Sequence, residues 1–303
     1  MFEKLPRRVS VYEVGLRDGL QAEPRFVPTE DKLRLANALV ATGLQRIEAS
    51  SFVHAKWIPA LADADQLVPR LPKGPTWSAL TPNLRGLERA LAAGITEVAV
   101  FLAASETYSL KNTNKSIAES LKSSEQVAVE AKKHGLKIRA YLSSVWGSPY
   151  EPGPDIELVV RITQQLLDMG CYEVSLGDTV GIGNPLQTQR ILEALFYKNV
   201  PKDKLAVHLH DTRGTALANA LVALELGITT FDASVGGLGG SPYAPGATGN
   251  LATEDLVNML HGMGIETGVD LAKLVQAAAI AQDLVGHPLT SKYFKAAIGS
   301  GAH

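Results

Sequence analysis

Two histidines, His208 and His210, stand one residue apart in the apolar run KLAVHLHDTRG (residues 204–214). Side chains of a β-strand alternate between its two faces, so a strand here would place both imidazoles on the same face. Such a pair is either a set of metal ligands or two hydrogen-bonded histidines of the core. The run alone is compatible with both interpretations, and the other polar residues of the chain discriminate between them.

Further polar residues stand where apolar runs end. Arg17 and Asp18 follow the first such run, Glu48 ends the second, Asp178 ends a later one, and a glycine-rich segment after the last one leads to Asn250. Imidazole, carboxylate and amide groups form a mixed nitrogen and oxygen set suited to Mg²⁺, Mn²⁺, Zn²⁺ or Co²⁺. Each residue also has a structural explanation, as a local ion pair, a helix cap or the buried partner of an arginine. Their joint position at strand ends favours the functional interpretation.

Composition narrows the class of partner. The net charge of −2 gives no basic field for nucleic acid or an anionic membrane, and we expect neither as a partner. The chain has one cysteine, Cys171, which excludes an internal disulfide and argues against a closed structural zinc site. An early strand in place of a signal peptide and the lack of a long apolar stretch lead us to expect a cytoplasmic protein.

A short β-branched run followed by a helical pattern recurs along the chain. We count eight such units at a spacing of roughly 25–40 residues, and the runs are apolar on both faces, as in a covered parallel sheet. Eight units in about 260 residues predict an α/β fold of the (β/α)8 TIM-barrel type rather than an open doubly wound sheet. No G-x-G-x-x-G motif follows the first run, which argues against a dinucleotide-binding fold.

We expect one catalytic domain over residues 1–303, with the barrel over about 9–265 and additional C-terminal helices over about 270–303. Catalytic groups of such barrels lie at the C-terminal ends of the strands and in the loops that follow. The polar residues should therefore converge although they are far apart in the chain. Arg17 and Asp18 are neighbours, so they share one site only if the chain turns there, as Gly19 permits.

Three segments resemble the 3-hydroxy-3-methylglutaryl-CoA (HMG-CoA) lyase family, which belongs to the metal-dependent lyase and condensing barrels that include isopropylmalate synthase. These segments are EVGLRDGLQ (13–21), HLHDT (208–212) and SVGGLGGSPYAPGATGNLATEDLV (234–257). The resemblance implies a (β/α)8 barrel that cleaves HMG-CoA into acetyl-CoA and acetoacetate.

The resemblance also implies roles for single residues. The ligands of a divalent cation, Mg²⁺ or Mn²⁺, would be Asp18, His208, His210 and Asn250. Arg17 would face the thioester carbonyl, and Glu48 would orient the polar network around it. Asp178 is implied as an acid–base candidate or as a group behind the ligands.

Substrate contacts are implied at a further set of positions. The segment KNTNKS (111–116) matches the family's loop near the CoA phosphate arm, which assigns Asn112 and Asn114 to CoA binding. Gln21 and Trp146 are further candidate contacts. The expected substrate is an acyl-CoA or a hydroxy acid. Barrels of this size often form homo-oligomers, although no sequence feature marks an interface.

The chemistry supports these roles independently. Cleaving a carbon–carbon bond beside a tertiary alcohol requires removal of the hydroxyl proton, and a bound cation lowers the pKa of that hydroxyl. Negative charge then develops on the thioester oxygen, where a guanidinium such as that of Arg17 stabilises the transition state. An acid must finally protonate the enolate carbon.

The chain departs from the family's pattern at several positions. The family's glycine-rich loop reads G-G-C-P-Y, with a catalytic acid–base cysteine, and Ser241 stands at that position here. Ser148 replaces a second cysteine, and Leu16 and Ala22 replace a proline and an asparagine of the first motif. A serine hydroxyl is a far poorer acid than a thiol, whose pKa is about 8.5. Ser241 is therefore a catalytic candidate whose chemistry differs from that of the family.

These departures leave several functions open. The chain is an HMG-CoA lyase with a different acid, or a relative that cleaves another 3-hydroxyacyl-CoA or a 2-hydroxy acid such as a malate derivative, with Trp146 reshaping the acyl pocket. An engineered replacement explains the lost cysteines less well, because two are missing. A condensing enzyme that uses acetyl-CoA would have the same metal site, but many such synthases carry a long extra C-terminal region. A non-catalytic metal- or CoA-binding descendant conflicts with the retention of Arg17 and Glu48.

Overall fold

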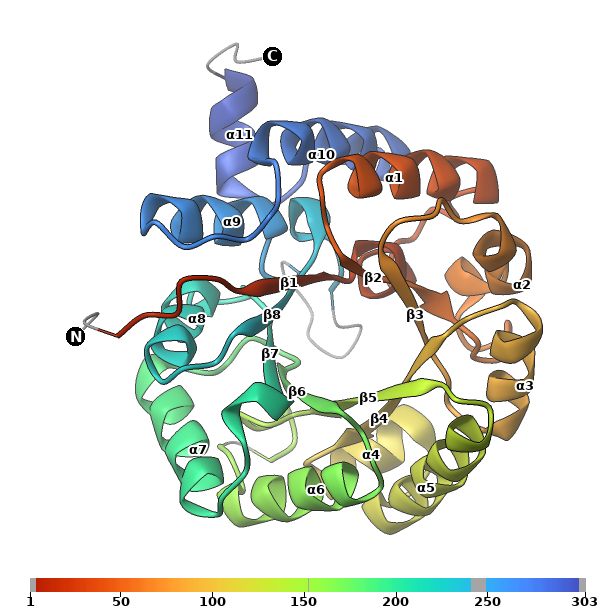
Figure 1. The fold of residues 1–303 in the computed structure, drawn as a ribbon, viewed down its shortest axis with the longest axis vertical. Coiled ribbons are helices and arrows are strands. Elements are labelled where there is room, and N and C mark those ends of the chain that lie inside the picture. The colour runs from red at the N-terminus through yellow and green to blue at the C-terminus, as the bar shows by residue number, and fades with distance from the viewer. Residues whose placement is uncertain (1–3, 152, 241–248, 300–303) are drawn as a thin grey trace.

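The computed structural model describes residues 4–151, 153–240 and 249–299. Eight parallel strands pair in chain order and close into a barrel, with β8 beside β1 (Figure 1). They are β1 (Ser10–Glu13), β2 (Arg46–Ser51), β3 (Thr76–Leu80), β4 (Glu97–Ala103), β5 (Lys137–Ser143), β6 (Glu173–Asp178), β7 (Leu205–Leu209) and β8 (Thr230–Ala233). The predicted (β/α)8 barrel is confirmed. We call the end of the barrel at the C-terminal ends of these strands the barrel mouth.

Helices surround the strands in the ring expected of this fold (Figure 1). They are α1 (Thr29–Ala41), α2 (Ala64–Leu67), α3 (Leu84–Ala92), α4 (Glu106–Thr113), α5 (Ile117–Lys133), α6 (Ile156–Asp168), α7 (Pro185–Tyr197), α8 (Ala216–Glu225), α9 (Thr253–Gly262), α10 (Leu271–Val285) and α11 (Lys292–Gly299). None of the described helices is both long and apolar enough to cross a membrane.

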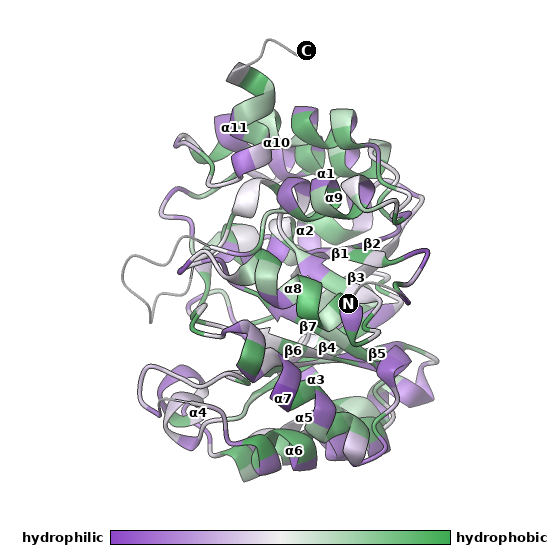
Figure 2. Cartoon of the chain, turned by 90° about the vertical axis from the view of Figure 1, so that its left-hand side faces the viewer, coloured by the Kyte–Doolittle hydropathy of each residue, from purple (hydrophilic) through white to green (hydrophobic). Residues whose placement is uncertain are grey.

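The predicted additional C-terminal helices are α10 and α11. α10 packs against α1 and α9, and α11 packs against α9 and α10. In the side view these helices lie at the end of the molecule opposite α5 and α6 (Figure 2). They therefore brace the first and last units of the barrel, where the ring closes.

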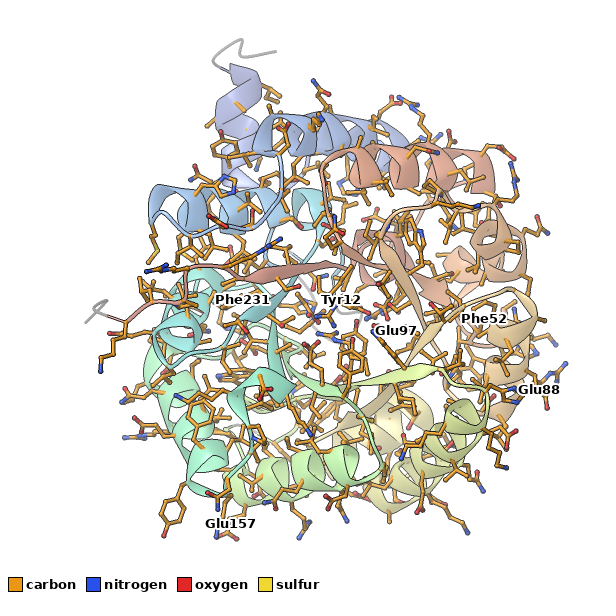
Figure 3. All side chains as sticks on the ribbon, viewed as in Figure 1. Tyr12, Phe52, Glu88, Glu97, Glu157 and Phe231 are labelled. Atoms are coloured by element: carbon orange, nitrogen blue, oxygen red, sulfur yellow. The ribbon has the colours of Figure 1, made fainter. Side chains whose placement is uncertain are left out.

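The interior of the barrel contains charged and aromatic side chains as well as aliphatic ones. Tyr12 and Glu97 lie toward the middle of the ring, whereas Glu88 and Glu157 lie at the outer edge of the molecule (Figure 3). Tyr12 and Glu97 are both buried. Charged groups inside a barrel remain stable only when they are paired or hydrogen-bonded, so this interior has a specified arrangement.

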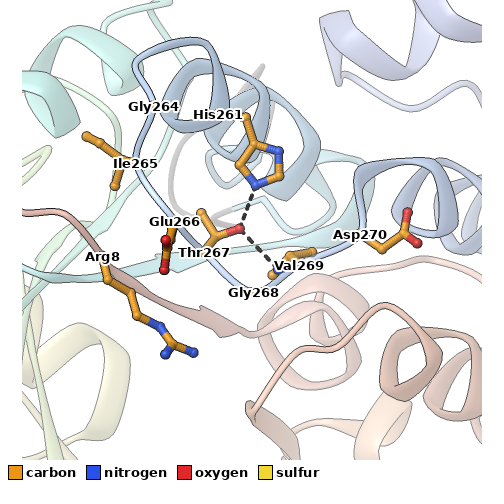
Figure 4. Close-up of a pocket in the computed structure, with 9 residues that line it drawn as sticks. All are labelled: Arg8, His261, Gly264, Ile265, Glu266, Thr267, Gly268, Val269 and Asp270. Carbon is orange, nitrogen blue, oxygen red and sulfur yellow. Dashed lines mark hydrogen bonds between the residues drawn. The ribbon is translucent and has the colours of Figure 1, made fainter.

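One surface pocket lies at the end of the barrel opposite the mouth. It has a volume of about 510 Å³ and is lined by Arg8, His261 and residues 264–270 (Figure 4). Thr267 is hydrogen-bonded to His261 and accepts the N–H of Val269. Arg8 precedes β1, so the pocket borders the N-terminal ends of the strands. Residues at this end of such barrels contribute to stability rather than to catalysis.

Candidate active site

The segment after β1 carries Arg17 and Asp18 on a single π-helical turn, η1 (Gly15–Gly19). This winding replaces the alternation of a strand, and the two neighbouring side chains therefore form an ion pair with each other. Gly15 is required at its start, because a Cβ there would lie 2.6 Å from Oε1 of Glu13. Single π turns recur at functional sites, where they redirect side chains in this way.

Glu48 from β2 and Tyr141 from β5 hold the guanidinium of Arg17. The Arg17 Nε donates to Oε2 of Glu48 at 2.5 Å, and the Tyr141 hydroxyl donates to the same oxygen at 3.0 Å. The guanidinium also lies 5.0 Å from the centre of the Tyr141 ring. Burial raises the pKa of Glu48, and the charge of Arg17 opposes that rise. Arg17 is thus held in one position before any substrate arrives.

Asp18, His208 and His210 converge at the barrel mouth. One ligand atom from each lies within 4.8 Å of the others. The two Nε2 atoms of the histidines are 3.3 Å apart, and Oδ2 of Asp18 lies 3.7 Å from that of His208 and 3.9 Å from that of His210. The two imidazoles share a side of the chain, as strand alternation predicts, although His210 lies just beyond the end of β7.

Asn250 reaches the same place through the backbone. It forms an isolated antiparallel bridge with His210, which brings the end of the glycine-rich loop against the end of β7. The Asn250 side-chain amide donates to Oδ2 of Asp18 at 2.8 Å and to the Leu238 carbonyl at 2.9 Å. The structure therefore brings all four residues of the predicted ligand set together.

This donor set fits a divalent cation. Burial, together with the neighbouring His208, lowers the pKa of His210 to about 4, so the imidazole is neutral near pH 7. Nδ1 of His210 is buried without a hydrogen-bond partner among the described residues. Burial raises the pKa of Asp18, but Arg17 and the two histidines outweigh it and hold that pKa well below its ordinary value. A charged carboxylate beside a neutral imidazole is what a metal ion requires of its ligands.

Asp178 is the last residue of β6 and does not stand at a helix start. Its carboxylate accepts the N–H groups of Ile182 and Gly183 at 3.0 and 2.9 Å, while Asn184 caps α7. The alternative explanation of Asp178 as a helix cap therefore does not apply, because the cap of α7 is Asn184. Burial raises its pKa to about 6, against the hydrogen bonds that lower it. That value suits a group that exchanges a proton near neutral pH.

Trp146 was predicted as a substrate contact, and the structure instead places it in the core. Its side chain is fully buried, and the indole N–H donates to Oγ1 of Thr188 at 3.0 Å. The ring packs against Gly183, where a Cβ would lie 2.5 Å from it. The large apolar ring has no exposed surface and packs against Gly183 and Thr188, so Trp146 belongs to the core beneath the mouth loops.

We expect Trp146→Ala to lower the free energy of unfolding by about 3–5 kcal/mol, because it removes a large buried ring and the hydrogen bond that its N–H donates to Thr188. Urea unfolding followed by circular dichroism measures this change. Trp57 is 74% exposed, so Trp57→Ala is the matched control and should shift stability by less than about 0.5 kcal/mol. Equal losses in the two variants would contradict the assignment of Trp146 to the core.

The remaining predicted contacts lie on the mouth side of the barrel. Gln21 is half-buried just after η1, Asn112 is half-buried in α4, and Asn114 is exposed at the end of that helix. α4 lies in the connection from β4 to α5, which leaves the barrel at the mouth. Ser241 lies outside the described residues.

Ser148 has a structural role that suits a hydroxyl. Its Oγ accepts the N–H groups of Tyr150 and Glu151 at 3.2 and 3.0 Å, and the Ser105 hydroxyl donates to it at 3.1 Å. The Glu151 carboxylate in turn accepts the hydroxyl and N–H of Thr107 in α4. Ser148 therefore joins the loop after β5 to the start of α4, and a thiol would accept these bonds more weakly.

Glu13 joins the two backbone segments that carry the site. Its Oε1 accepts the N–H groups of Gly15 and Val235 at 2.8 and 2.9 Å, and its Oε2 accepts the Thr253 hydroxyl at 2.6 Å. Val235 opens the short turn η5 (Val235–Gly237), from which the glycine-rich loop starts. The π turn and the root of that loop are thus fixed to each other.

Glu254 supports the same root, because both of its carboxylate oxygens accept the N–H of Gly236. Burial raises its pKa from 4.5 to about 8. Between these two values the folded protein binds more protons than the unfolded chain, so stability falls as pH rises from about 5 to 8. Glu254→Gln should flatten this slope and gain stability at pH 8 relative to the parent, as measured by urea unfolding across that range. An unchanged slope would contradict the prediction.

Sequence reasoning missed Tyr141 and one more interior residue, Asp232. Tyr141 touches Glu48 and Arg17, and Asp232 touches His208. Both are polar residues in the middle of apolar strands, and both face the barrel interior. That interruption of an otherwise apolar run is the signal by which they could have been found.

Comparison with known proteins agrees with this geometry. A sequence model of the HMGL-like family matches residues 8–281. The chain belongs to the HMGL-like family. It is 53% identical over 289 residues to the hydroxymethylglutaryl-CoA lyase YngG of Bacillus subtilis, covering 95% of this chain and 96% of that protein. The family resemblance drawn from three motifs and the carbon–carbon lyase class are confirmed.

Solved structures of HMGL-like relatives superpose closely. The HMG-CoA lyase of B. subtilis has a TM-score of 0.94 at 51% identity, over 96% of this chain and 98% of that one. An HMG-CoA lyase from Acinetobacter baumannii, solved in complex with coenzyme A and 3-methylmalate, has a TM-score of 0.92 at 37% identity, over 98% of this chain and 97% of that one.

Proposed function

We propose that this HMGL-like protein cleaves HMG-CoA into acetyl-CoA and acetoacetate and requires Mg²⁺ or Mn²⁺. The observation that carries the proposal is the convergence of Asp18, His208 and His210 beside the fixed guanidinium of Arg17. The B. subtilis relative named as a hydroxymethylglutaryl-CoA lyase supports the choice of substrate. The A. baumannii relative, which was solved with coenzyme A and 3-methylmalate, supports a site that accepts an acyl-CoA or a hydroxy acid.

Asp18, His208, His210 and Asn250 would hold the cation. When bound, such an ion lowers the pKa of a substrate hydroxyl and polarises substrate oxygens, and Zn²⁺ or Co²⁺ would also suit these ligands. In the cleavage, the proton leaves the tertiary hydroxyl of HMG-CoA and the bond between C2 and C3 breaks. C3 becomes the ketone carbon of acetoacetate, and the electron pair passes to C2 and the thioester oxygen as an enolate. Protonation of C2 then gives acetyl-CoA.

Arg17 is the group we assign to the enolate oxygen. Its guanidinium is always charged, and Glu48 and Tyr141 already fix its orientation. A cation fixed in advance stabilises the developing negative charge without reorganising during the reaction. Asp178, with its pKa near 6, is the proposed group for moving a proton at this end of the barrel.

The arm of the CoA substrate would lie along the mouth. We assign Gln21, Asn112 and Asn114 to it, because all three stand on the mouth side with exposed or half-buried side chains. Lys111 adds a positive charge on α4 and lies over the ring of Tyr150. These assignments concern binding, and each variant should raise KM more than it lowers kcat.

The test is acetoacetate production from HMG-CoA by purified protein supplied with Mg²⁺ or Mn²⁺, with and without EDTA. We expect turnover that EDTA abolishes and that added metal restores. Metal binding without turnover would move the substrate to another 3-hydroxyacyl-CoA or a 2-hydroxy acid. CoA release from acetyl-CoA and a 2-oxo acid would instead identify a condensing enzyme, and we expect none.

Ser241 is proposed to stand where the resembling family places its acid–base thiol. Ser241→Cys is therefore expected to raise kcat at pH 8, because a thiol with a pKa of about 8.5 exchanges protons far more readily than a serine hydroxyl. Ser148→Cys is the control, since it adds a thiol at a position that holds a loop, and it should not raise kcat. If Ser241→Cys does not raise kcat, we would assign protonation of the enolate carbon to another group, and Asp178 is the first candidate.

A further inference from the structure

Asp232 lies next to the candidate ligand His208 in the sheet. The two residues are register partners across β7 and β8, so their side chains stand beside each other on the interior face. Nδ1 of His208 lies 3.3 Å from Oδ2 of Asp232. Nε2 of the same ring faces the opposite way, toward His210 and Asp18. One imidazole therefore spans the distance between an interior carboxylate and the candidate metal site.

Asp232 is held firmly from the other side. Two guanidinium nitrogens of Arg139 donate to its two oxygens at 2.6 and 3.0 Å, and the Ser175 hydroxyl donates at 2.8 Å. Asp232 and Arg139 have essentially no exposed surface. A bidentate pair with an arginine, which does not lose its charge, keeps the carboxyl ionised, so it acts only as an acceptor.

Arg139 is fixed in turn by its surroundings. Its Nε donates to Glu173 at 2.7 Å, and Glu173 also pairs with Arg46 at 2.8 Å. The Arg139 guanidinium also contacts two rings, 3.9 Å from the centre of Tyr12 and 4.9 Å from that of Tyr141. The chain of ion pairs from Arg46 through Glu173 and Arg139 to Asp232 therefore runs inside the barrel and ends at His208.

We propose that Asp232 is a positioning residue for the metal site, which keeps the proton of His208 on Nδ1 and thereby presents Nε2 as the ligand atom. The inference rests on the proposed metal function of His208. Since an ionised carboxylate only accepts, the Nδ1 atom that faces it must carry the hydrogen, and the lone pair remains on Nε2. A carboxylate behind a ligating histidine orients the ring and makes it a stronger donor to the metal.

The test compares Mn²⁺ binding in Asp232→Asn and Glu173→Gln, measured by the electron paramagnetic resonance signal of free Mn²⁺. Asp232→Asn removes the charge beside His208 and should raise the Kd for Mn²⁺ by about 10–100-fold. Glu173→Gln removes a charge from the same buried network, at a residue bonded to Arg139 instead of His208, and should change the Kd by less than about threefold. Equal effects in the two variants, or no effect in Asp232→Asn, would overturn the proposal.

A second measurement needs no change to the network. The ¹⁵N shifts of the ring nitrogens of His208 at pH 8, assigned with His208→Gln as the reference, report which nitrogen carries hydrogen. We expect a protonated Nδ1 and a bare Nε2 in the metal-free protein, and hydrogen on Nε2 would overturn the proposal. Failure of the parent protein to bind Mn²⁺ would reject the proposed metal function, while the ¹⁵N shifts would still decide the role of Asp232 in fixing the tautomer.

Discussion

His210→Ala is expected to abolish Mn²⁺-dependent turnover and to weaken Mn²⁺ binding by more than about 100-fold, which exceeds the usual effect of removing a group behind a ligand. The fold should survive. Nδ1 of His210 has no hydrogen-bond partner among the described residues, so the substitution breaks no hydrogen bond at this atom. Circular dichroism and the Mn²⁺ resonance signal measure the two parts of this prediction.

His134→Ala is the matched control for His210→Ala. His134 is a half-exposed histidine at the end of α5, paired with Glu130 of the same helix. Its loss removes an imidazole without touching the barrel mouth, and both Mn²⁺ affinity and kcat should stay within about twofold of the parent, as expected of a surface change. Unchanged activity in His210→Ala would reject the metal assignment, whatever the control shows.

The barrel was predictable because parallel strands that are covered on both faces appear in the sequence as short runs of consecutive apolar residues. The run LAVHL, for example, is buried at all five positions of β7, and the helical pattern after it closes on Gly227. Once the barrel was expected, the position of His208 and Asp178 at strand ends followed from the general geometry of the fold. Local periodicity and one architectural rule were sufficient for these residues.

Contacts across the barrel interior were not predictable in the same way. Tyr141 and Glu48 are 93 residues apart, and Arg139 and Asp232 are separated by the same interval. Whether they meet depends on the register with which eight strands close, which no single strand encodes. Strand alternation shows only that each side chain faces inward.

Two local features also escaped prediction, each for its own reason. A turn at Arg17 and Asp18 was expected, but its π-helical form was not, because a single turn leaves no repeating pattern in the sequence. Trp146 follows β5 at the mouth, but its ring is fully buried and packs against Gly183, 37 positions further along the chain. Burial by a distant segment cannot be read from neighbouring residues.

Arg17→Gln is expected to lower kcat by on the order of 10²–10³-fold, the usual cost of removing a group that stabilises a developing oxyanion. Mn²⁺ binding should persist, because Arg17 is not a ligand and Asp18 keeps its bond to Asn250. Glu48 would lose its charged partner, and burial would then raise its pKa further, which favours the neutral carboxyl at this buried position. Steady-state kinetics with the CoA substrate measure the loss.

Arg17→Lys separates the charge from its geometry. A lysine keeps one positive charge but cannot present the planar fork that bonds Glu48 and Asp18 at once. If orientation matters as much as charge, Arg17→Lys should recover only a small part of the activity that Arg17→Gln loses, with a greater effect on kcat than on KM. Full activity in Arg17→Lys would show that a positive charge at this position is sufficient and that the geometry of the guanidinium is not needed. A kcat within tenfold of the parent in Arg17→Gln would remove Arg17 from the reaction altogether, and the charge on the enolate oxygen would then have to be met by the metal site.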